Sequence, residues 1–187
     1  MLREKRLFVL VVGAVLVGLL ALTPTAASGQ GQQKMGGAWL GIKAGGGHRW
    51  VGSIAPLDSA AREAALHVRF TVYSSMMAGL LGKNDADSFS EFVGEGRMMN
   101  RTTAQFTLVG YALKRSQLGQ VPEIKLIFIA YGTWEFTDSA HAVLKYSINV
   151  YLAATDADGD GMPDAGSSPI LPPVPVTDFA LRVPILP

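Results

Sequence analysis

The sequence predicts an all-β fold, an antiparallel meander of seven or eight strands that forms a closed or partly open barrel. Three observations predict it. Apolar and polar residues alternate with a period of two over long stretches, which is typical of half-buried strands. Turn signals separate these stretches. The strands are long, and closing long strands into a barrel removes their unpaired edges. A β-sandwich is the alternative.

The expected elements follow one another at short intervals along the chain. Strands are expected at Ala38–Lys43, Arg49–Ala55, Leu66–Val72, Phe89–Met99, Phe106–Leu113, Ile124–Phe136 and Ala142–Leu152. Turn signals stand at Gly45–Gly47, Gly82–Asp85, Gly119–Pro122 and Thr137–Ser139. Glycines within strands, where such sheets bend sharply, are Gly94, Gly96, Gly110 and Gly132. One short helix is predicted at Pro56–Glu63, with Asp58 or Ser59 as its N-cap.

The C-terminal segment 169–187 is rich in proline, so it cannot form a helix or a central strand throughout. Either it packs on the barrel as an extended arm, with Thr177–Val183 adding an edge strand, or it trails as a flexible linker. Its many bulky apolar residues favour packing. The domain plan is therefore a barrel over 38–154, a loop over 155–168 and a tail packed on the barrel.

The N-terminal segment 1–28 has the pattern of a secretory signal peptide. Basic residues in the first six positions precede the apolar run Leu7–Leu22, and the small residues Ala26, Ala27 and Ser28 follow. The run is short of the roughly 20 residues that span a bilayer, which argues against an uncut membrane anchor. We expect cleavage before Ser28 or Gly29, a flexible segment over 29–37, and a secreted or periplasmic bacterial protein without a stable membrane anchor.

Composition excludes several classes of function. The formal net charge of +1 argues against a protein that mainly binds nucleic acid, because such a protein needs a basic surface. The absence of cysteine excludes disulfide scaffolds, thiolate zinc sites and thiol catalysis. His48, His67 and His141 are too far apart in sequence for a zinc-binding pair. We expect His48 in a loop and His67 on the surface.

One motif carries chemistry, an acidic loop at residues 156–164. Asp156, Asp158 and Asp160 alternate, Gly161 permits a sharp turn, and Asp164 stands at the ninth position. Calcium takes six to eight hard oxygen ligands, and alternate side chains on a curled loop converge on one point. The backbone carbonyl of Met162 is a further candidate ligand, and Ser167 stands where an EF-hand has its bidentate glutamate. The alternative is a solvated acidic loop that binds nothing specific.

These nine residues resemble the DxDxDGxxD loops of dockerin and thrombospondin type 3 modules, which are common in exported proteins. The resemblance implies that Asp156, Asp158, Asp160 and Asp164 are side-chain ligands of Ca²⁺. A single loop without the last carboxylate should bind weakly, with a dissociation constant on the order of 10⁻⁴ to 10⁻³ M. We therefore expect a structural clip and not a sensor.

A second resemblance concerns the first expected strand. Gly37-Ala38-Trp39 is similar to the Gly-x-Trp that opens the first strand of lipocalins. The resemblance implies a secreted barrel whose apolar interior holds a small hydrophobic molecule.

Three functions follow from these patterns. The first is a non-enzymatic exported barrel with a structural calcium that binds a small hydrophobic ligand. The second is a module with a filled core that recognises an envelope protein or a polysaccharide, since large side chains can fill a barrel of eight strands. The third, an enzyme, would need inward-facing carboxylates from Glu91, Glu95 or Glu135, and we do not expect it.

Overall fold

The fold is known from a computed structural model, which describes residues 36–58, 62–115 and 120–184. The predicted signal peptide and nearly all of the segment 29–37 lie outside the described residues. The described part contains the strands β1 (Gly37–Lys43), β2 (Arg49–Pro56), β3 (Glu63–Val72), β4 (Ser88–Phe89), β5 (Phe92–Met98), β6 (Thr103–Lys114), β7 (Glu123–Phe136), β8 (His141–Leu152) and β9 (Val174–Arg182).

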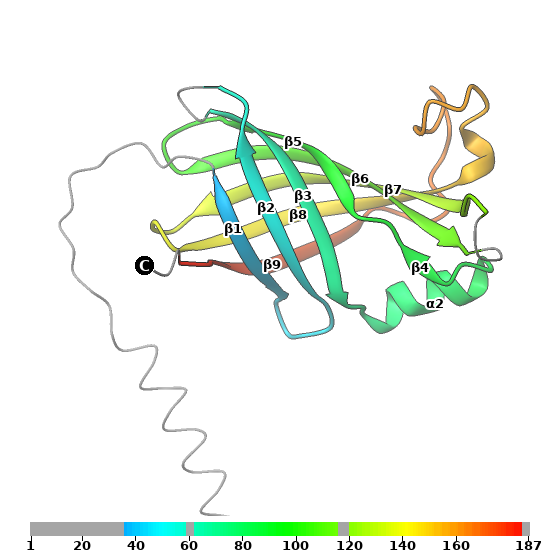
Figure 1. Cartoon of the computed structure of the whole chain (residues 1–187), viewed down its shortest axis with the longest axis horizontal. Helices are drawn as coiled ribbons and strands as arrows, with labels where there is room; N and C mark the ends of the chain where they lie inside the picture. Colours follow the sequence, from blue (N-terminus) through cyan, green and yellow to red (C-terminus); the bar gives the residue numbers. More distant parts are fainter. Residues whose placement is uncertain (1–35, 59–61, 116–119, 185–187) are drawn as a thin grey trace, which may run out of the picture. The chain divides into compact units, whose positions relative to one another are not determined.

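Eight of these strands close into an antiparallel barrel (Figure 1). Their order is β1-β2-β3-β5-β6-β7-β8-β9, and β9 pairs with β1 to complete the ring. Each strand therefore lies beside its neighbour in sequence, as in an up-and-down barrel. The predicted barrel of seven or eight strands is confirmed, and the sandwich alternative is wrong.

The expected single strand Phe89–Met99 is two strands, β4 and β5. Both run along β6, which gives the barrel one strand outside its ring of eight. At the break, the backbone N–H of Ser90 donates to the carbonyl of Tyr111 and the Ser90 hydroxyl accepts from the N–H of Tyr111. The Ser90 hydroxyl thus replaces a backbone carbonyl as the acceptor for the N–H of Tyr111, at the point where the strand pairing with β6 is interrupted.

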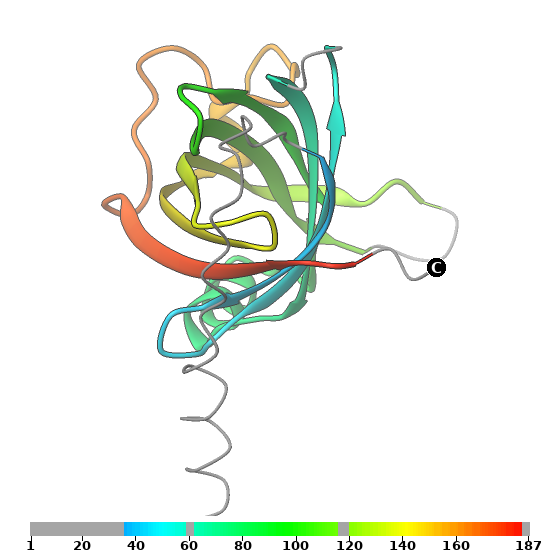
Figure 2. The same cartoon turned by 90° about the vertical axis from the view of Figure 1, so that its left-hand side faces the viewer.

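The proline-rich C-terminal segment provides a full strand of the barrel wall. Phe179 pairs with Ile42 of β1 on one side and with Val143 of β8 on the other. Figure 2 shows β1 and β9 side by side. The expectation of an edge strand is therefore wrong, because β9 closes the ring. Its only proline, Pro175, stands near the start of the strand, where a missing N–H costs least.

The helix predicted at Pro56–Glu63 is contradicted by the described residues of this segment, which leave out 59–61. Pro56 ends β2 and Glu63 begins β3, so this segment connects a β-hairpin. The carboxylate of Asp58 accepts hydrogen bonds from the backbone N–H groups of Arg62 and Glu63, at 2.6 and 3.2 Å. The aspartate therefore closes a turn and does not begin a helix.

The one α-helix in the described part of the chain is α2 (Ser75–Lys83), which sequence analysis missed. The Ser74 hydroxyl caps it by accepting from the N–H of Met77 at 3.2 Å. Met77, Leu80 and Leu81 share one face and are buried. The turn predicted after Gly82 is present, because Asn84 ends the helix by donating to two of its last carbonyls.

We expect Ser74→Ala to lower the free energy of unfolding by about 1 kcal/mol, because the N–H of Met77 loses its partner. Urea denaturation followed by circular dichroism measures this change. Ser75→Ala, one residue further on and exposed, is the matched control and should change stability by less than about 0.5 kcal/mol. Equal effects of the two changes would contradict the capping role.

The barrel interior is packed with aromatic and aliphatic side chains. Trp39 and Trp50 each meet Trp134 edge-on, with ring centroids 5.3 and 6.0 Å from it. Phe136 stacks on Trp134 at 5.9 Å. Edge-to-face contacts of this kind add to the stability that burial supplies.

No helix among the described residues is long and apolar enough to cross a membrane.

Candidate metal centre and barrel interior

The acidic loop lies in the long connection between β8 and β9, drawn in orange at the right of Figure 1. It begins with a short 3₁₀ helix, Ala153–Thr155. Two hydrogen bonds tie the connection to the barrel wall. The hydroxyl of Tyr111 on β6 donates to the carbonyl of Gly161 at 3.1 Å, and the N–H of Ile170 donates to the carbonyl of Val150 at 2.8 Å. The loop is therefore fixed on the outside of the sheet.

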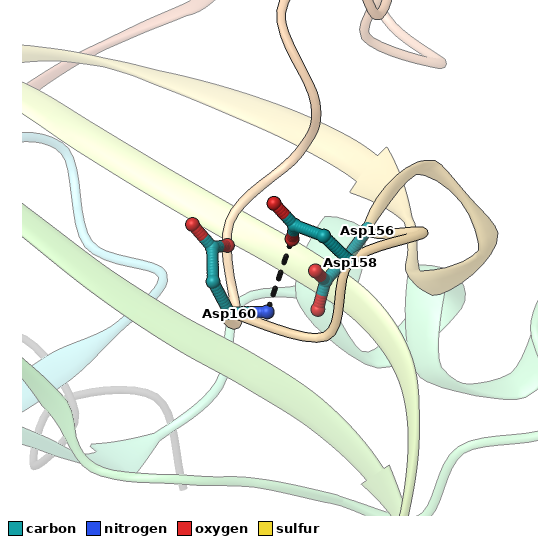
Figure 3. A group of neighbouring side chains, drawn as sticks. All are labelled: Asp156, Asp158 and Asp160. Atoms are coloured by element: carbon teal, nitrogen blue, oxygen red, sulfur yellow. Dashed lines mark hydrogen bonds between the residues drawn. The ribbon is translucent and has the colours of Figure 1, made fainter.

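Three of the predicted ligands are brought together. Asp156, Asp158 and Asp160 each offer a carboxylate oxygen, and these oxygens lie within 4.8 Å of one another (Figure 3). Asp156 is half-buried, and the other two are exposed. Within the described ranges this is the one group of at least three histidine or acidic side chains close enough to hold a metal ion. The structure thus contains an acidic cluster that could bind a metal.

Hydrogen bonds inside the loop produce this convergence. The carboxylate of Asp156 accepts from the N–H of Gly161 at 3.0 Å, and that of Asp160 accepts from the N–H of Met162 at 2.7 Å. The carboxylate of Asp158 accepts from the N–H of Asp160 at 3.2 Å, the bond drawn in Figure 3. Gly161 has a φ of +88°, a left-handed conformation that glycine adopts without strain.

Asp164 has a different place in the loop. Its carboxylate accepts from the N–H of Ala157 at 3.2 Å, and its own N–H donates to the carbonyl of Thr155 at 2.7 Å. It therefore closes the loop on itself and is not one of the three clustered carboxylates. Met162 is anchored through its N–H, as the hydrogen bond to Asp160 shows.

One atom of the cluster lacks a partner. Oδ1 of Asp156 is buried and accepts no hydrogen bond from the described residues. A buried acceptor without a donor costs free energy, and a bound cation would remove that cost. The donor set, made of carboxylate oxygens on a tightly curled loop, fits a hard cation such as calcium or magnesium.

A second polar group, which sequence analysis missed, lies inside the barrel. Asp178 on β9 is fully buried, and its carboxylate accepts three hydrogen bonds. The donors are Nε2 of His48 at 3.0 Å, Nε1 of Trp50 at 2.7 Å and the hydroxyl of Tyr146 at 2.9 Å. His48 stands in the loop before β2, as expected, yet it is buried. We call these four residues the buried polar cluster.

The buried polar cluster affects the acidity of Tyr146. Burial raises the pKa of the Tyr146 phenol well above its ordinary value, and the negative charge of Asp178 and the hydrogen bond to it raise it further. Tyr146 therefore keeps its proton at neutral pH and donates a hydrogen bond to Asp178. The alternation along β9 places Val176, Asp178 and Ala180 on the inner face, and this was the signal that could have found the cluster.

The space left inside the barrel is small. An internal cavity of about 30 Å³ lies beside the buried polar cluster and is lined by apolar atoms. That volume holds about one water molecule, whereas pockets for small ligands measure roughly 300 to 1,000 Å³. The interior expected to hold a hydrophobic molecule is thus occupied by the protein's own side chains.

The three glutamates that the enzyme alternative required face away from the interior. Glu91 and Glu95 are exposed, and Glu135 forms an ion pair on the outside with Lys145 at 2.8 Å. His67 is exposed as expected. Among the described carboxylates, Asp178 is the one that is buried, and its three hydrogen-bond donors hold it in place.

Comparisons with protein-family models, with curated proteins and with solved structures found no match.

Proposed function

We propose that this chain is an exported, non-enzymatic β-barrel module with a filled core, a structural calcium ion in the β8–β9 loop, and a binding role for its outer surface. The observation that carries the proposal is the internal cavity of about 30 Å³, which leaves no room for a ligand of ordinary size. Of the two binding functions that the sequence suggests, the filled-core module is therefore favoured over the carrier.

The calcium part of the proposal rests on the clustered carboxylates of Asp156, Asp158 and Asp160 and on the unpaired oxygen of Asp156. The carbonyl of Met162 and the carboxylate of Asp164, directly or through water, would add ligands, and solvent would complete the shell. A bound Ca²⁺ would offset the mutual repulsion of three carboxylates held within 4.8 Å. It would also stiffen the connection that leads into β9.

We expect 10 mM Ca²⁺ to raise the free energy of unfolding by about 1.4 to 2.7 kcal/mol, the gain for dissociation constants on the order of 10⁻³ to 10⁻⁴ M. Thermal unfolding with and without Ca²⁺ measures the gain. The double variant Asp158→Ala, Asp160→Ala should abolish it. The matched control, Glu91→Ala with Glu95→Ala, removes two exposed carboxylates, one just before β5 and one within it, and should keep the gain.

A stabilisation by Ca²⁺ that survives in the double aspartate variant would place the ion elsewhere and overturn this part of the proposal. An equal gain with Mg²⁺ would show that the loop does not distinguish the two cations. It would then be a general site for hard cations and not a calcium site.

The export part of the proposal rests on the basic start, the short apolar run and the small residues before Ser28. Expression in an exporting bacterium, followed by N-terminal sequencing of the product, tests it. A mature protein that begins at Ser28 or Gly29 supports export with cleavage. A cell-associated product that keeps Met1 contradicts it.

A further inference from the structure

A patch of exposed apolar side chains covers the outer face of β1, β2 and β9. Its members are Leu40, Ile42, Val51, Phe179 and Leu181, with exposed fractions between 38 and 53%. The strand register makes them direct neighbours, because Leu40 pairs with Val51 and Leu181, and Ile42 pairs with Phe179. Contiguous exposed apolar side chains on a soluble domain mark binding surfaces.

This patch is hollowed into a groove of about 490 Å³. Besides the five apolar side chains, its walls include Arg49 of β2, Thr71 of β3 and His141 of β8. We call it the outer groove. Arg49 pairs with Ile42, and His141 pairs with Leu181, so the two basic residues stand at opposite ends with β1 and β9 between them.

The two ends of the outer groove differ in charge. His141 is paired with Asp138, whose carboxylate lies 2.9 Å from Nδ1. Arg49 is exposed and has no ion-pair partner in the described part of the chain. Among the described residues, no carboxylate lines the groove. One end therefore offers a cation without a counter-ion, and the rest offers an apolar wall.

We propose that the outer groove binds a single-chain anionic amphiphile, a free fatty acid, with its carboxylate on Arg49 and its acyl chain across Ile42, Leu40 and Phe179. Arginine pairs well with a carboxylate, through two parallel hydrogen bonds. Three strand spacings separate β2 from β8, or about 14 Å, which suits a chain of about ten to twelve carbons.

The charge of the groove disfavours a second copy of this chain as the occupant. A two-fold contact sets the same patch against itself, so it would bury Arg49 from both copies with no lining carboxylate to pair with them. The asymmetry between the two ends also matches a molecule with one charged end. This site is separate from the calcium loop and from the barrel interior, so its failure would leave the proposed function standing.

Isothermal titration with dodecanoate below its critical micelle concentration tests the proposal, with dodecyltrimethylammonium as the cationic probe of equal chain length. We expect one equivalent of dodecanoate and no binding of the cation. Arg49→Gln should weaken dodecanoate binding about tenfold or more, and Ile42→Asp should abolish it. Arg69→Gln is the matched control, because Arg69 is an exposed cation on neighbouring β3 that does not line the groove.

Five results would overturn the proposal. Equal binding of both probes, or equal losses in Arg49→Gln and Arg69→Gln, would remove the role of Arg49. Dodecanoate binding that survives Ile42→Asp would place the ligand elsewhere, and thermal unfolding of that variant shows whether it is folded. A dimer by analytical ultracentrifugation that Ile42→Asp dissociates, with no dodecanoate bound, would identify a second copy as the occupant. Binding only to vesicles of anionic phospholipid would identify a lipid surface.

Discussion

Replacing Asp178 with alanine is expected to lower the free energy of unfolding by about 3 to 5 kcal/mol. The change leaves three donors, on His48, Trp50 and Tyr146, inside the barrel without their acceptor. Each unpaired buried donor costs about 1 to 3 kcal/mol. Urea denaturation at neutral pH, followed by circular dichroism, measures the loss.

Asp138 supplies a matched control, because it also pairs with a histidine but does so on the surface. Asp138→Ala should cost no more than about 1 kcal/mol, the range for exposed ion pairs. If Asp178→Ala does not fold, Tyr146→Phe removes a single donor and should cost about 1 to 2 kcal/mol. Similar losses for Asp138→Ala and Asp178→Ala, or no loss for Tyr146→Phe, would show that the buried polar cluster does not stabilise the barrel.

Gly132→Ala is the second change with a large expected effect, a loss of about 3 kcal/mol or more. A Cβ atom on Gly132 would lie 2.2 Å from the carbonyl oxygen of Lys145 and 2.5 Å from Cα of Tyr146, both in the backbone of β8. The backbone of a paired strand cannot move aside as a flexible side chain can, so the barrel must distort. Thermal or urea unfolding of the variant measures the cost.

Gly79 offers the opposite case in the same chain. It is an exposed residue within α2, and a Cβ atom there would meet nothing within 4 Å. Gly79→Ala should therefore raise the free energy of unfolding by about 0.5 to 1 kcal/mol, because alanine is the better helix former. A barrel that tolerates Gly132→Ala as well as Gly79→Ala would contradict the close approach of β7 and β8.

The strands of the barrel could be predicted from the sequence because each has one face toward the core. In β6, Phe106 and Leu108 are buried while Thr107 between them is exposed, and this contrast is what a period of two records. The break between β4 and β5 could not be predicted in this way. It depends on the Ser90 hydroxyl accepting from the backbone of β6, a contact between residues far apart in sequence.

The misplaced helix has a physical explanation. Asp58 and Ser59 are good helix-capping residues, but aspartate closes turns as readily as it begins helices. The strands on both sides of this segment favour the turn over the helix. The real helix contains Gly79 and Gly82, two poor helix formers. Its stability comes from the Ser74 cap and from Leu80 and Leu81, which pack into the barrel core.

The two polar sites differ in how far sequence could reveal them. The acidic loop is local, since its candidate ligands lie within nine residues, and its spacing predicted the three clustered aspartates. The buried polar cluster is not local. Asp178 and His48 are 130 residues apart and meet only because β9 lies beside β1. Because the C-terminal segment is rich in proline, sequence analysis assigned β9 to a tail, and Asp178 was therefore not recognised as an inward-facing residue.

The pairing of the first strand with the last has a consequence for synthesis. A chain leaves the ribosome from its N-terminus, so β1 through β8 emerge while the partner that both β1 and β8 require is still inside the tunnel. In the finished barrel Trp39 of β1 pairs with Arg182 of β9. Until β9 emerges, one edge of β1 and one edge of β8 have no partner strand and can pair with other chains. A nascent chain stalled before residue 174 should remain open and sensitive to protease, and release of the last strand should protect the whole barrel at once.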